Sequence, residues 1–556
     1  MAGSPTYPTR EAVDFVVIGS GAAGGVMARE LSVAGFNVVV LEQGPYRRAH
    51  DFTHDEIGVV FQGELSLDPA EHPQTFRARP EQNAEVPPQG AGLPPAWYAA
   101  GVGGSSVHFT GNYWRFRPVD FKERSLLGEI EGTTFADWPL TYEELEPYYT
   151  RVDWEIGVSG APGPFDPPRS RPYPVPPLPL KSSGAILERG AKALGLHPQV
   201  APMAILSKPH NGRPACIHCG FCLGFGCEMN AKSSTLAAMI PQAEATGRCE
   251  IRTGCTVMRL EHDERGRIRD VVYLDENGVE QAQRTRAAVL SANGAESARL
   301  LLLSQSAQHP DGMANGSGMV GKNLMFNAHS ATHAWFEEPL NEFKSVQCTR
   351  IVHDFYETDP KRGFYGGGGI DARPLVNSWP ILFAMGGIAP GLPTWGAEYK
   401  RLLERYFTRN MSVLGNCTSL AMERNSISLD PELKDVFGRP AVRVTYEDHP
   451  DDLATARFMQ DQSVAILEAA GAQRLWRDEV RPSTGGPHLL GTCRMGDDPD
   501  RSVVDRYHRA HEVNNLFVVD GSNFVTSGRG QPTMTIQALA FRAAEHMTKA
   551  ARAGEI

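Results

Sequence analysis

Four of the nine cysteines in this chain of 556 residues lie within one short, glycine-rich stretch, CIHCGFCLGFGC. They are Cys216, Cys219, Cys222 and Cys227. Thiolates held this close together repel one another unless a cation or a cluster takes up their charge, so zinc and iron–sulfur are the main interpretations, with free or disulfide-bonded thiols as the third. Structural zinc usually takes two cysteine pairs separated by a longer span. The spacing C-x-x-C-x-x-C-x-x-x-x-C therefore favours a compact iron–sulfur cluster, with three or four irons.

A second set of residues that could take part in chemistry lies near the start of the chain, in DFVVIGSGAAGGVMARELSVAGFNVVVLEQGP. The stretch predicts a buried strand, a glycine turn, a helix and a second buried strand. Gly19 permits the tight turn, Gly21 lets the backbone approach a pyrophosphate, and Gly24 lets the helix pack close to the strand. Glu42 ends the second strand, where an acid hydrogen-bonds a ribose hydroxyl. The unit predicts a dinucleotide site but does not by itself decide between FAD and NAD.

Composition limits what the rest of the chain can be. A hydrophobic content of 41% over this length predicts a large core divided between two or three domains. The net charge of -11 and the absence of a basic cluster argue against nucleic-acid binding. No apolar run is long enough for a transmembrane helix, and the first residues have no apolar segment typical of a signal peptide.

Several longer segments resemble the glucose-methanol-choline (GMC) family of FAD oxidoreductases. They include AAGVGGSSVHFTGNYWRFRPVDF, GGPHLLGTCRMGDDPDRSVVD and NLFVVDGSNFVTSGRGQPTMTIQALAFRAAEHM, and the similarity extends over nearly the whole chain. Within the family the sequence is most similar to large catalytic subunits of the gluconate 2-dehydrogenase and glucoside 3-dehydrogenase type. The resemblance implies an α/β fold, α+β in part, in which separated pieces form a Rossmann-like FAD-binding domain around an inserted substrate domain of sheet and helices.

The expected domain boundaries follow from these segments. For the FAD-binding domain we expect residues 1–60, 95–135, 228–335 and 485–556. For the substrate domain and its connectors we expect 61–94, 136–210 and 336–484, with 211–227 as the cysteine-rich loop. The proline-rich run from 160 to 180 is expected to be an extended connector.

Residues expected to hold the cofactor are spread over four segments. In GVGGSSVHF, Gly103 and Gly104 leave room for a ring system or phosphates against the backbone, and Ser105 offers a hydroxyl or an amide. His108 is similar in position to the histidine that pyranose oxidases bond covalently to flavin, and a packed or hydrogen-bonding histidine is the alternative. The resemblance places the Val257 backbone against the adenine and Ala292 against the nucleotide.

The C-terminal segment completes this expected site. An apolar strand ends at Asp520 and Gly521, a break suited to an acid that meets the cofactor. A helix then begins with Pro532 and Thr533. If its N-terminus points at the flavin ring, as in the family, it stabilises the negative charge of reduced flavin.

Oxidation of an alcohol needs a base for the hydroxyl proton, a task that suits histidine. His488, in a stretch similar to the family's H-x-x-G-T-C, is the expected base. The family's partner residue is commonly Asn or His, but this chain has Gln531 there, which can donate an amide hydrogen bond to the substrate. Asn523 is the second candidate for that role.

The cysteine loop directly precedes a segment that the family places beside FAD, so we expect electrons to pass from flavin to an iron–sulfur cluster and then to another protein. If only three thiols bind, we expect Cys219 to be left out, because related dehydrogenases vary in spacing around that position. The remaining cysteines are expected to be buried apolar residues: Cys249, Cys255, Cys348, Cys417 and Cys493.

The leading hypothesis is an FAD and iron–sulfur dehydrogenase that oxidises a secondary hydroxyl of a sugar or glycoside, with C3 favoured, to a keto sugar. The expected partners are a small subunit carrying an export signal and a c-type cytochrome or similar acceptor, which would place the enzyme in the periplasm by co-export, and otherwise in the cytoplasm. One alternative is an oxidase of the pyranose oxidase type with structural zinc at the cysteines. Another is a non-redox relative in which flavin is only structural.

Overall fold

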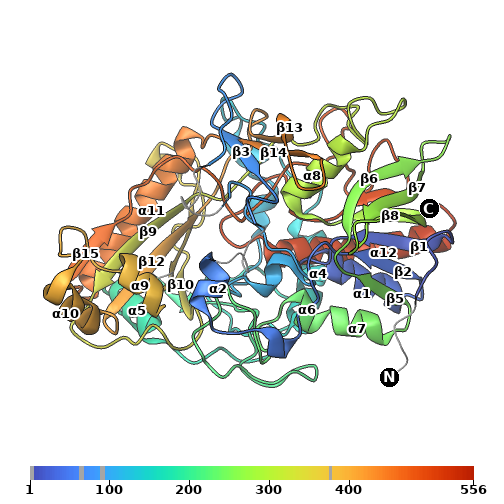
Figure 1. Ribbon diagram of the computed structural model, residues 1–556. Helices are drawn as coiled ribbons and strands as arrows, with labels where there is room; N and C mark the ends of the chain where they lie inside the picture. The colour runs from blue at the N-terminus through green and yellow to red at the C-terminus, as the bar shows by residue number, and fades with distance from the viewer. Residues whose placement is uncertain (1–5, 62–67, 88–93, 375–378) are drawn as a thin grey trace.

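The computed structural model describes residues 6–61, 68–87, 94–374 and 379–556. Two sheets lie at opposite ends of the molecule, with a third, small sheet beside the gap between them (Figure 1). The expected domain ranges also include residues 1–5, 62–67, 88–93 and 375–378, which lie outside the described residues.

The first sheet has seven strands and is the expected nucleotide-binding sheet. Its strands are β1 (Val13–Ile18), β2 (Val38–Leu41), β5 (Cys249–Arg252), β6 (Thr256–His262), β7 (Ile268–Leu274), β8 (Glu280–Leu290) and β16 (Leu516–Val518). The order β5-β2-β1-β8 is parallel, β16 adds to β8 in parallel, and β7 and β6 continue from β8 as antiparallel strands. Because β1 and β2 are buried on both faces, they consist almost entirely of apolar residues.

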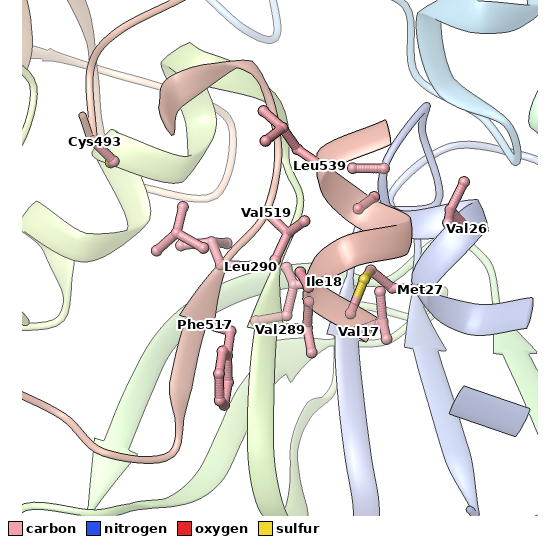
Figure 2. Close-up of a cluster of buried hydrophobic side chains, with 14 of the residues drawn as sticks. Val17, Ile18, Val26, Met27, Val289, Leu290, Cys493, Phe517, Val519 and Leu539 are labelled. Carbon is pink, nitrogen blue, oxygen red and sulfur yellow. The ribbon is translucent and has the colours of Figure 1, made fainter. Parts of the chain in front are cut away.

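Helices cover this sheet and contribute side chains to the hydrophobic core. They are α1 (Gly24–Val33), α4 (Tyr142–Ile156), α6 (Thr235–Ala238), α7 (Ile240–Ala245), α8 (Asn293–Leu303) and α12 (Thr533–Arg552). Figure 2 shows Val17 and Ile18 of β1, Leu290 of β8 and Met27 of α1 in one buried cluster with Leu539 of α12. The predicted strand, turn, helix and strand at the N-terminus are therefore confirmed.

The second sheet has six strands, all antiparallel to their neighbours, in the order β15-β9-β12-β11-β10-β4. They are β4 (Gln199–Val200), β9 (His329–Trp335), β10 (Arg350–Val352), β11 (Gly368–Ala372), β12 (Asn410–Cys417) and β15 (Arg474–Arg477). Its helices are α5 (Ser182–Ala193), α9 (Pro380–Gly386), α10 (Gly396–Tyr406) and α11 (Pro450–Ala469). Of these, α11 packs along β9 and β12.

The remaining elements connect the two halves. The small sheet contains β3 (Gln74–Arg77), β13 (Ser426–Lys434) and β14 (Pro440–Thr445), and two short helices are α2 (Glu56–Phe61) and α3 (Glu123–Leu127). Short 3₁₀ turns occupy Ala49–Asp51, Gly104–Val107, Pro118–Phe121, Pro360–Arg362 and Gly521–Asn523.

Two expected boundaries differ from the structure. Strand β9, within the range 228–335 expected for the FAD-binding domain, is the second strand of the six-stranded sheet. Helix α4, within the range 136–210 expected for the substrate domain, packs against α12 beside the nucleotide sheet. Neither displacement has a signal in the local sequence, because strand and helix patterns do not reveal which sheet they join. The proline-rich run from 160 to 180 contains neither a helix nor a ladder strand, as expected.

Gly24 fixes the approach of α1 to the glycine turn. A Cβ atom there would lie 1.9 Å from the carbonyl oxygen of Gly19. We expect Gly24→Ala to lower the free energy of unfolding by about 1–3 kcal/mol, since the backbone of the turn must shift to admit the methyl group. Urea denaturation measures this, with Gly386→Ala as the control because a Cβ at Gly386 meets open space. Equal midpoints for Gly24→Ala and wild type would contradict the close approach.

Candidate functional site

A cavity of about 680 Å³ lies between the two larger sheets. Its nucleotide side is formed by the turn after β1, the end of β2, the turn from β8 to α8, the residues after β16 and the first turn of α12. Its other side includes His329 at the start of β9 and Arg373 just after β11. The cavity therefore lies beyond the carboxyl ends of the parallel strands, where open α/β sheets bind ligands.

Most of the residues expected to hold a cofactor or to act in catalysis line this cavity. They are Gly19, Gly21, Glu42, Gly104, Ser105, His108, Val257, Ala292, His488, Asp520, Gly521, Gln531, Pro532 and Thr533. Gly24 and Gly103 lie behind this surface and pack against backbone and side chains: Gly24 against Gly19, and Gly103 against Leu236 and Val107.

Three turns meet at the nucleotide end with no side chains between them. Gly19 has φ +89, and a Cβ there would lie 2.6 Å from the Ser291 carbonyl oxygen. A Cβ on Gly104, at φ +53, would lie 2.8 Å from the Cα of Gly21. The bare backbone and the N-terminal end of α1 suit a pyrophosphate, so the residues present fit a dinucleotide.

Glu42 holds these turns together. Its two carboxylate oxygens accept from the backbone amides of Ser20, Gly44 and Gly101, and from the Ser20 hydroxyl at 2.6 Å. Burial raises the pKa of Glu42, and these hydrogen bonds oppose that shift. Because four donors already occupy the carboxylate, Glu42 positions the loops, and its expected contact with a ribose stays a prediction.

Asp520 holds the turn at the start of α8 in the way that Glu42 holds the glycine turns. It accepts from the backbone amide of Asn293 at 3.1 Å, the Ser297 hydroxyl at 2.5 Å and the Ser522 amide at 2.9 Å. These bonds fix the turn that carries Ala292. The first turn of α12 also opens onto the cavity and has no acidic residue, so its dipole favours negative charge there.

The orientation and tautomer of His488 follow from its neighbour Asn327. The Asn327 side-chain nitrogen donates to the backbone carbonyls of Cys417, Ser527 and Gly528, so its oxygen must be the acceptor. That oxygen lies 2.9 Å from Nδ1 of His488, which therefore carries the ring proton. The Nε2 lone pair of His488 is left available, as a general base requires.

The pKa of His488 is lowered to about 3, first by burial and then by the nearby His329 and Arg373. A base acts only when deprotonated, so activity should fall as the pH drops through this lowered pKa and not near the usual value of about 6.5. We expect kcat/KM to be level from about pH 5 to pH 8 and to decline below that range. Anaerobic flavin reduction after rapid pH jumps measures the profile, and a decline centred near the ordinary histidine pKa would contradict it.

The residues on the cavity wall opposite His488 were not predicted from the sequence. His329 has its ring open to the cavity, with its centroid 5.7 Å from that of His488. Asn416 lies opposite His329 in the pairing of β9 and β12, and its side-chain oxygen accepts from Nε2 of Gln531 at 3.1 Å. No motif marks His329 and Asn416, because the pairing of two strands far apart in the sequence brings them together.

Asn523 was a wrong candidate for the partner of the base. It is fully buried away from the cavity lining. Its side-chain oxygen bonds Nδ1 of His508 at 2.8 Å and its nitrogen donates to the Cys493 carbonyl at 3.0 Å, so it has a structural role. Gln531 lines the cavity as expected, with one amide hydrogen committed to Asn416 and its carbonyl oxygen without a partner among the described residues.

His108 joins the cavity to the cysteine loop. Its Nδ1 lies 2.7 Å from the Gly224 carbonyl and donates to it, which leaves Nε2 as the unprotonated ring nitrogen. Burial lowers the pKa of His108 to about 4. Leu223 and Gly224, between the third and fourth cysteines of the loop, themselves line the cavity. The cysteine loop and the expected flavin site are therefore in direct contact.

The four clustered cysteines surround a small cavity of about 20 Å³. Burial raises the pKa of Cys216 to about 11 and of Cys222 to about 12. The backbone amides of His218 and Lys232 lie within hydrogen-bonding reach of the sulfurs of Cys216 and Cys227, at 3.3 and 3.5 Å. Thiols with such raised pKa values become thiolates when a metal binds, so these residues fit a metal or cluster better than a reactive thiol.

Lys232 adds a positive charge beside this group. It is 2% exposed, and Nζ donates to the carbonyls of Phe109, Cys222 and Phe225. None of the nine cysteines is in a disulfide, and the five outside the loop are all buried, as predicted. Among the described helices, none combines the length and apolar character needed to cross a bilayer.

Comparison with known proteins gives consistent matches along the chain. The family described as GMC oxidoreductase matches residues 421–540, and the FAD binding domain matches 14–85. The chain is 35% identical to 2-methyl-1,2-propanediol dehydrogenase of Mycolicibacterium austroafricanum, covering 96% of this chain and 95% of that protein. It is 29% identical to the gluconate 2-dehydrogenase flavoprotein of Pantoea cypripedii, covering 96% and 93%. It is 28% identical to the fructose dehydrogenase large subunit of Gluconobacter japonicus, covering 96% and 97%.

The fold is shared more widely. A formate oxidase variant from Aspergillus oryzae superposes with a TM-score of 0.67 at 14% identity, covering 99% of this chain and 100% of that one. The mixed α/β architecture is the one expected from the sequence.

Proposed function

Because the chain belongs to the glucose-methanol-choline family of FAD oxidoreductases, acting on alcohol or sugar substrates, we propose that it is the catalytic subunit of a sugar dehydrogenase. In this proposal it oxidises a secondary hydroxyl of a sugar or glycoside, with C3 favoured, to a keto sugar. Electrons leave through an iron–sulfur cluster held by Cys216, Cys219, Cys222 and Cys227. Bound FAD supplies the acceptor for the hydride.

The role of this chain's own residues follows from the cavity. Nε2 of His488 takes the proton of the substrate hydroxyl, with Asn327 fixing the ring. Gln531 and His329 lie on the same cavity surface and orient that hydroxyl. The N-terminal turn of α12 favours the negative charge that a reduced flavin carries.

The observation that carries the dehydrogenase proposal is the contact between the two cavities. Leu223 and Gly224 line the large cavity, while the cysteines that flank them line the small one. An oxidase that passes both electrons to oxygen at the flavin has no need for a metal group in this position. A dehydrogenase that passes single electrons to another protein does need a metal group close to the flavin.

The proposed partners are a small subunit carrying an export signal and a c-type cytochrome or similar acceptor. Support comes from a relative named as a large subunit, which implies a smaller one, and from Ile217, an apolar residue of the cysteine loop that is 57% exposed. Export together with such a subunit would place the enzyme in the periplasm.

A second candidate is a sugar oxidase with structural zinc at the loop. The ligand atoms of His54, Cys219 and Glu228 lie within 4.8 Å of one another, and imidazole, thiolate and carboxylate are ligands that zinc accepts. In this candidate Cys219 belongs to a mononuclear site and oxygen accepts the electrons.

Anaerobic titration with a panel of sugars and glycosides, followed by absorbance and by electron paramagnetic resonance, separates the candidates. The dehydrogenase proposal expects flavin bleaching together with an iron–sulfur signal in the same sample. A bleached flavin with bound zinc and no iron supports the oxidase. A flavin that no sugar or alcohol bleaches would refute both and leave a structural flavin.

A further inference from the structure

The substrate side of the large cavity contains a buried cation that neither the expected nucleotide nor the base explains. Arg373 is 6% exposed and lines the cavity. Its Nε and Nη2 donate to the two carboxylate oxygens of Asp371 at 3.2 and 2.6 Å, and Nη2 also reaches the Asn416 oxygen at 3.3 Å. Nη1 has no partner among the described residues. Because Arg373 lines the cavity, this N–H group is available to a ligand there.

The guanidinium is held rigidly. Asp371 is fully buried and also accepts from the side-chain amides of Asn112 at 3.2 Å and Asn416 at 3.0 Å. Asp371 and Asn416 lie on the paired strands β11 and β12. Since Asn416 also accepts from Gln531, one network fixes the directions of both Arg373 and Gln531. Nη1 therefore does not turn away to find another acceptor.

Arg373 lies beside the proposed base. Arg373, His488 and His329 line the same cavity, and the charge of Arg373 contributes to the lowered pKa of both histidines. Because both residues line one cavity, a substrate with its reacting hydroxyl at Nε2 of His488 can turn its neighbouring carbon toward Arg373. The oxygen atom on that carbon is then the first acceptor available to Nη1.

The charge balance indicates which acceptor the site prefers. Asp371 already neutralises Arg373 as a buried ion pair. A carboxylate or phosphate would therefore be buried without a net opposite charge, whereas a neutral hydroxyl or ether oxygen satisfies the free N–H at no such cost.

We propose that Arg373 is a specificity-determining residue whose Nη1 donates to the oxygen on the carbon next to the oxidised one. The site thereby selects alcohols with a vicinal oxygen, as in 1,2-diols and sugar rings, over simple alcohols. The proposal rests on the proposed function in one respect, namely that His488 receives the proton of the reacting hydroxyl. Its test includes a binding measurement that does not depend on turnover.

The test compares trans-1,2-cyclohexanediol with cyclohexanol in anaerobic flavin reduction. Wild type should prefer the diol by about 10- to 100-fold, because a hydrogen bond to a charged group contributes roughly 1.5–3 kcal/mol. Arg373→Met should remove most of this preference by lowering kcat/KM for the diol, while the value for cyclohexanol changes less than about threefold. Arg373→Lys keeps the charge but not the fork geometry and should restore only part of the preference.

Two controls keep the outcome interpretable. Arg481→Met removes an exposed arginine paired with Glu479 and should leave both substrates unaffected. Binding of 2-hydroxycyclohexanone and cyclohexanone, measured by flavin difference spectra, should show the same Arg373-dependent preference without any turnover. Equal losses on both substrates, or a diol preference that survives in Arg373→Met, would overturn the proposal. If wild type reduces neither alcohol but Arg373 still governs ketone binding, only the proposed function fails.

Discussion

His488→Ala is expected to lower the rate of anaerobic flavin reduction by substrate about 10²- to 10⁴-fold, the range that a positioned general base contributes. The reason is the single nitrogen that the structure leaves available. Asn327 fixes the proton on Nδ1, so only Nε2 faces the reacting hydroxyl. Rapid mixing with substrate under anaerobic conditions measures the rate of flavin bleaching directly.

The effect should be confined to chemistry. The side chain of His488 hydrogen-bonds Asn327 and, among the described residues, none of the glycine turns at the nucleotide end, so the flavin content of His488→Ala should equal that of wild type. His50→Ala is the matched control, because His50 is an exposed histidine whose side chain is 76% accessible. A His488→Ala variant with full flavin and an unchanged rate of bleaching would eliminate His488 as the base.

Asn327 gives an independent check of the same geometry. Replacing it by Ala removes the acceptor for Nδ1, so the ring can turn or adopt the other tautomer. The rate should fall by less than in His488→Ala, since a base remains near the substrate. Asn327→Asp should retain more activity than Asn327→Ala, because a carboxylate still accepts from Nδ1.

The nucleotide half of this site could be predicted from sequence because its residues act within one local unit. Gly19, Gly21 and Glu42 belong to one continuous strand, turn, helix and strand, and each residue type has a reason that its own segment supplies. Pro532 and Gly521 likewise mark the ends of secondary-structure elements, because proline and glycine limit where a helix or strand can continue. The structure places these residues around one cavity.

The substrate half could not be predicted in the same way. His329 and Asn416 come from two strands and Arg373 directly follows a third, β11, all separated by long stretches of chain, and only the strand pairing makes them neighbours. Asn523 was misjudged for the opposite reason, since it is close in sequence to the motif but its side chain points into a structural network. Proximity in sequence indicates a site only where the local fold exposes the side chain to it.

Cys222→Ser is expected to separate the two half-reactions. Cys222 is the most buried of the four clustered thiols, and its loss leaves three sulfurs around the small cavity. Iron content should fall to below about a tenth of the wild-type value, since binding of a metal group depends on its full ligand set. Flavin bleaching by substrate should persist because the flavin cavity keeps its lining. Reduction of a one-electron acceptor protein such as cytochrome c should be lost along with the iron.

The matched control for Cys222→Ser is Cys249→Ala, which changes a fully buried cysteine of β5 outside the loop. It should keep its iron and its reduction of the acceptor. The zinc alternative predicts a different pattern, because its ligands are His54, Cys219 and Glu228. Cys222→Ser should then keep its zinc, and turnover with oxygen should continue. The proposal places the electron exit at this loop, where Leu223 and Gly224 connect the two cavities. A Cys222→Ser variant that keeps both its iron and its reduction of the acceptor would contradict that placement. The cysteine loop would then serve only to support the wall of the flavin cavity.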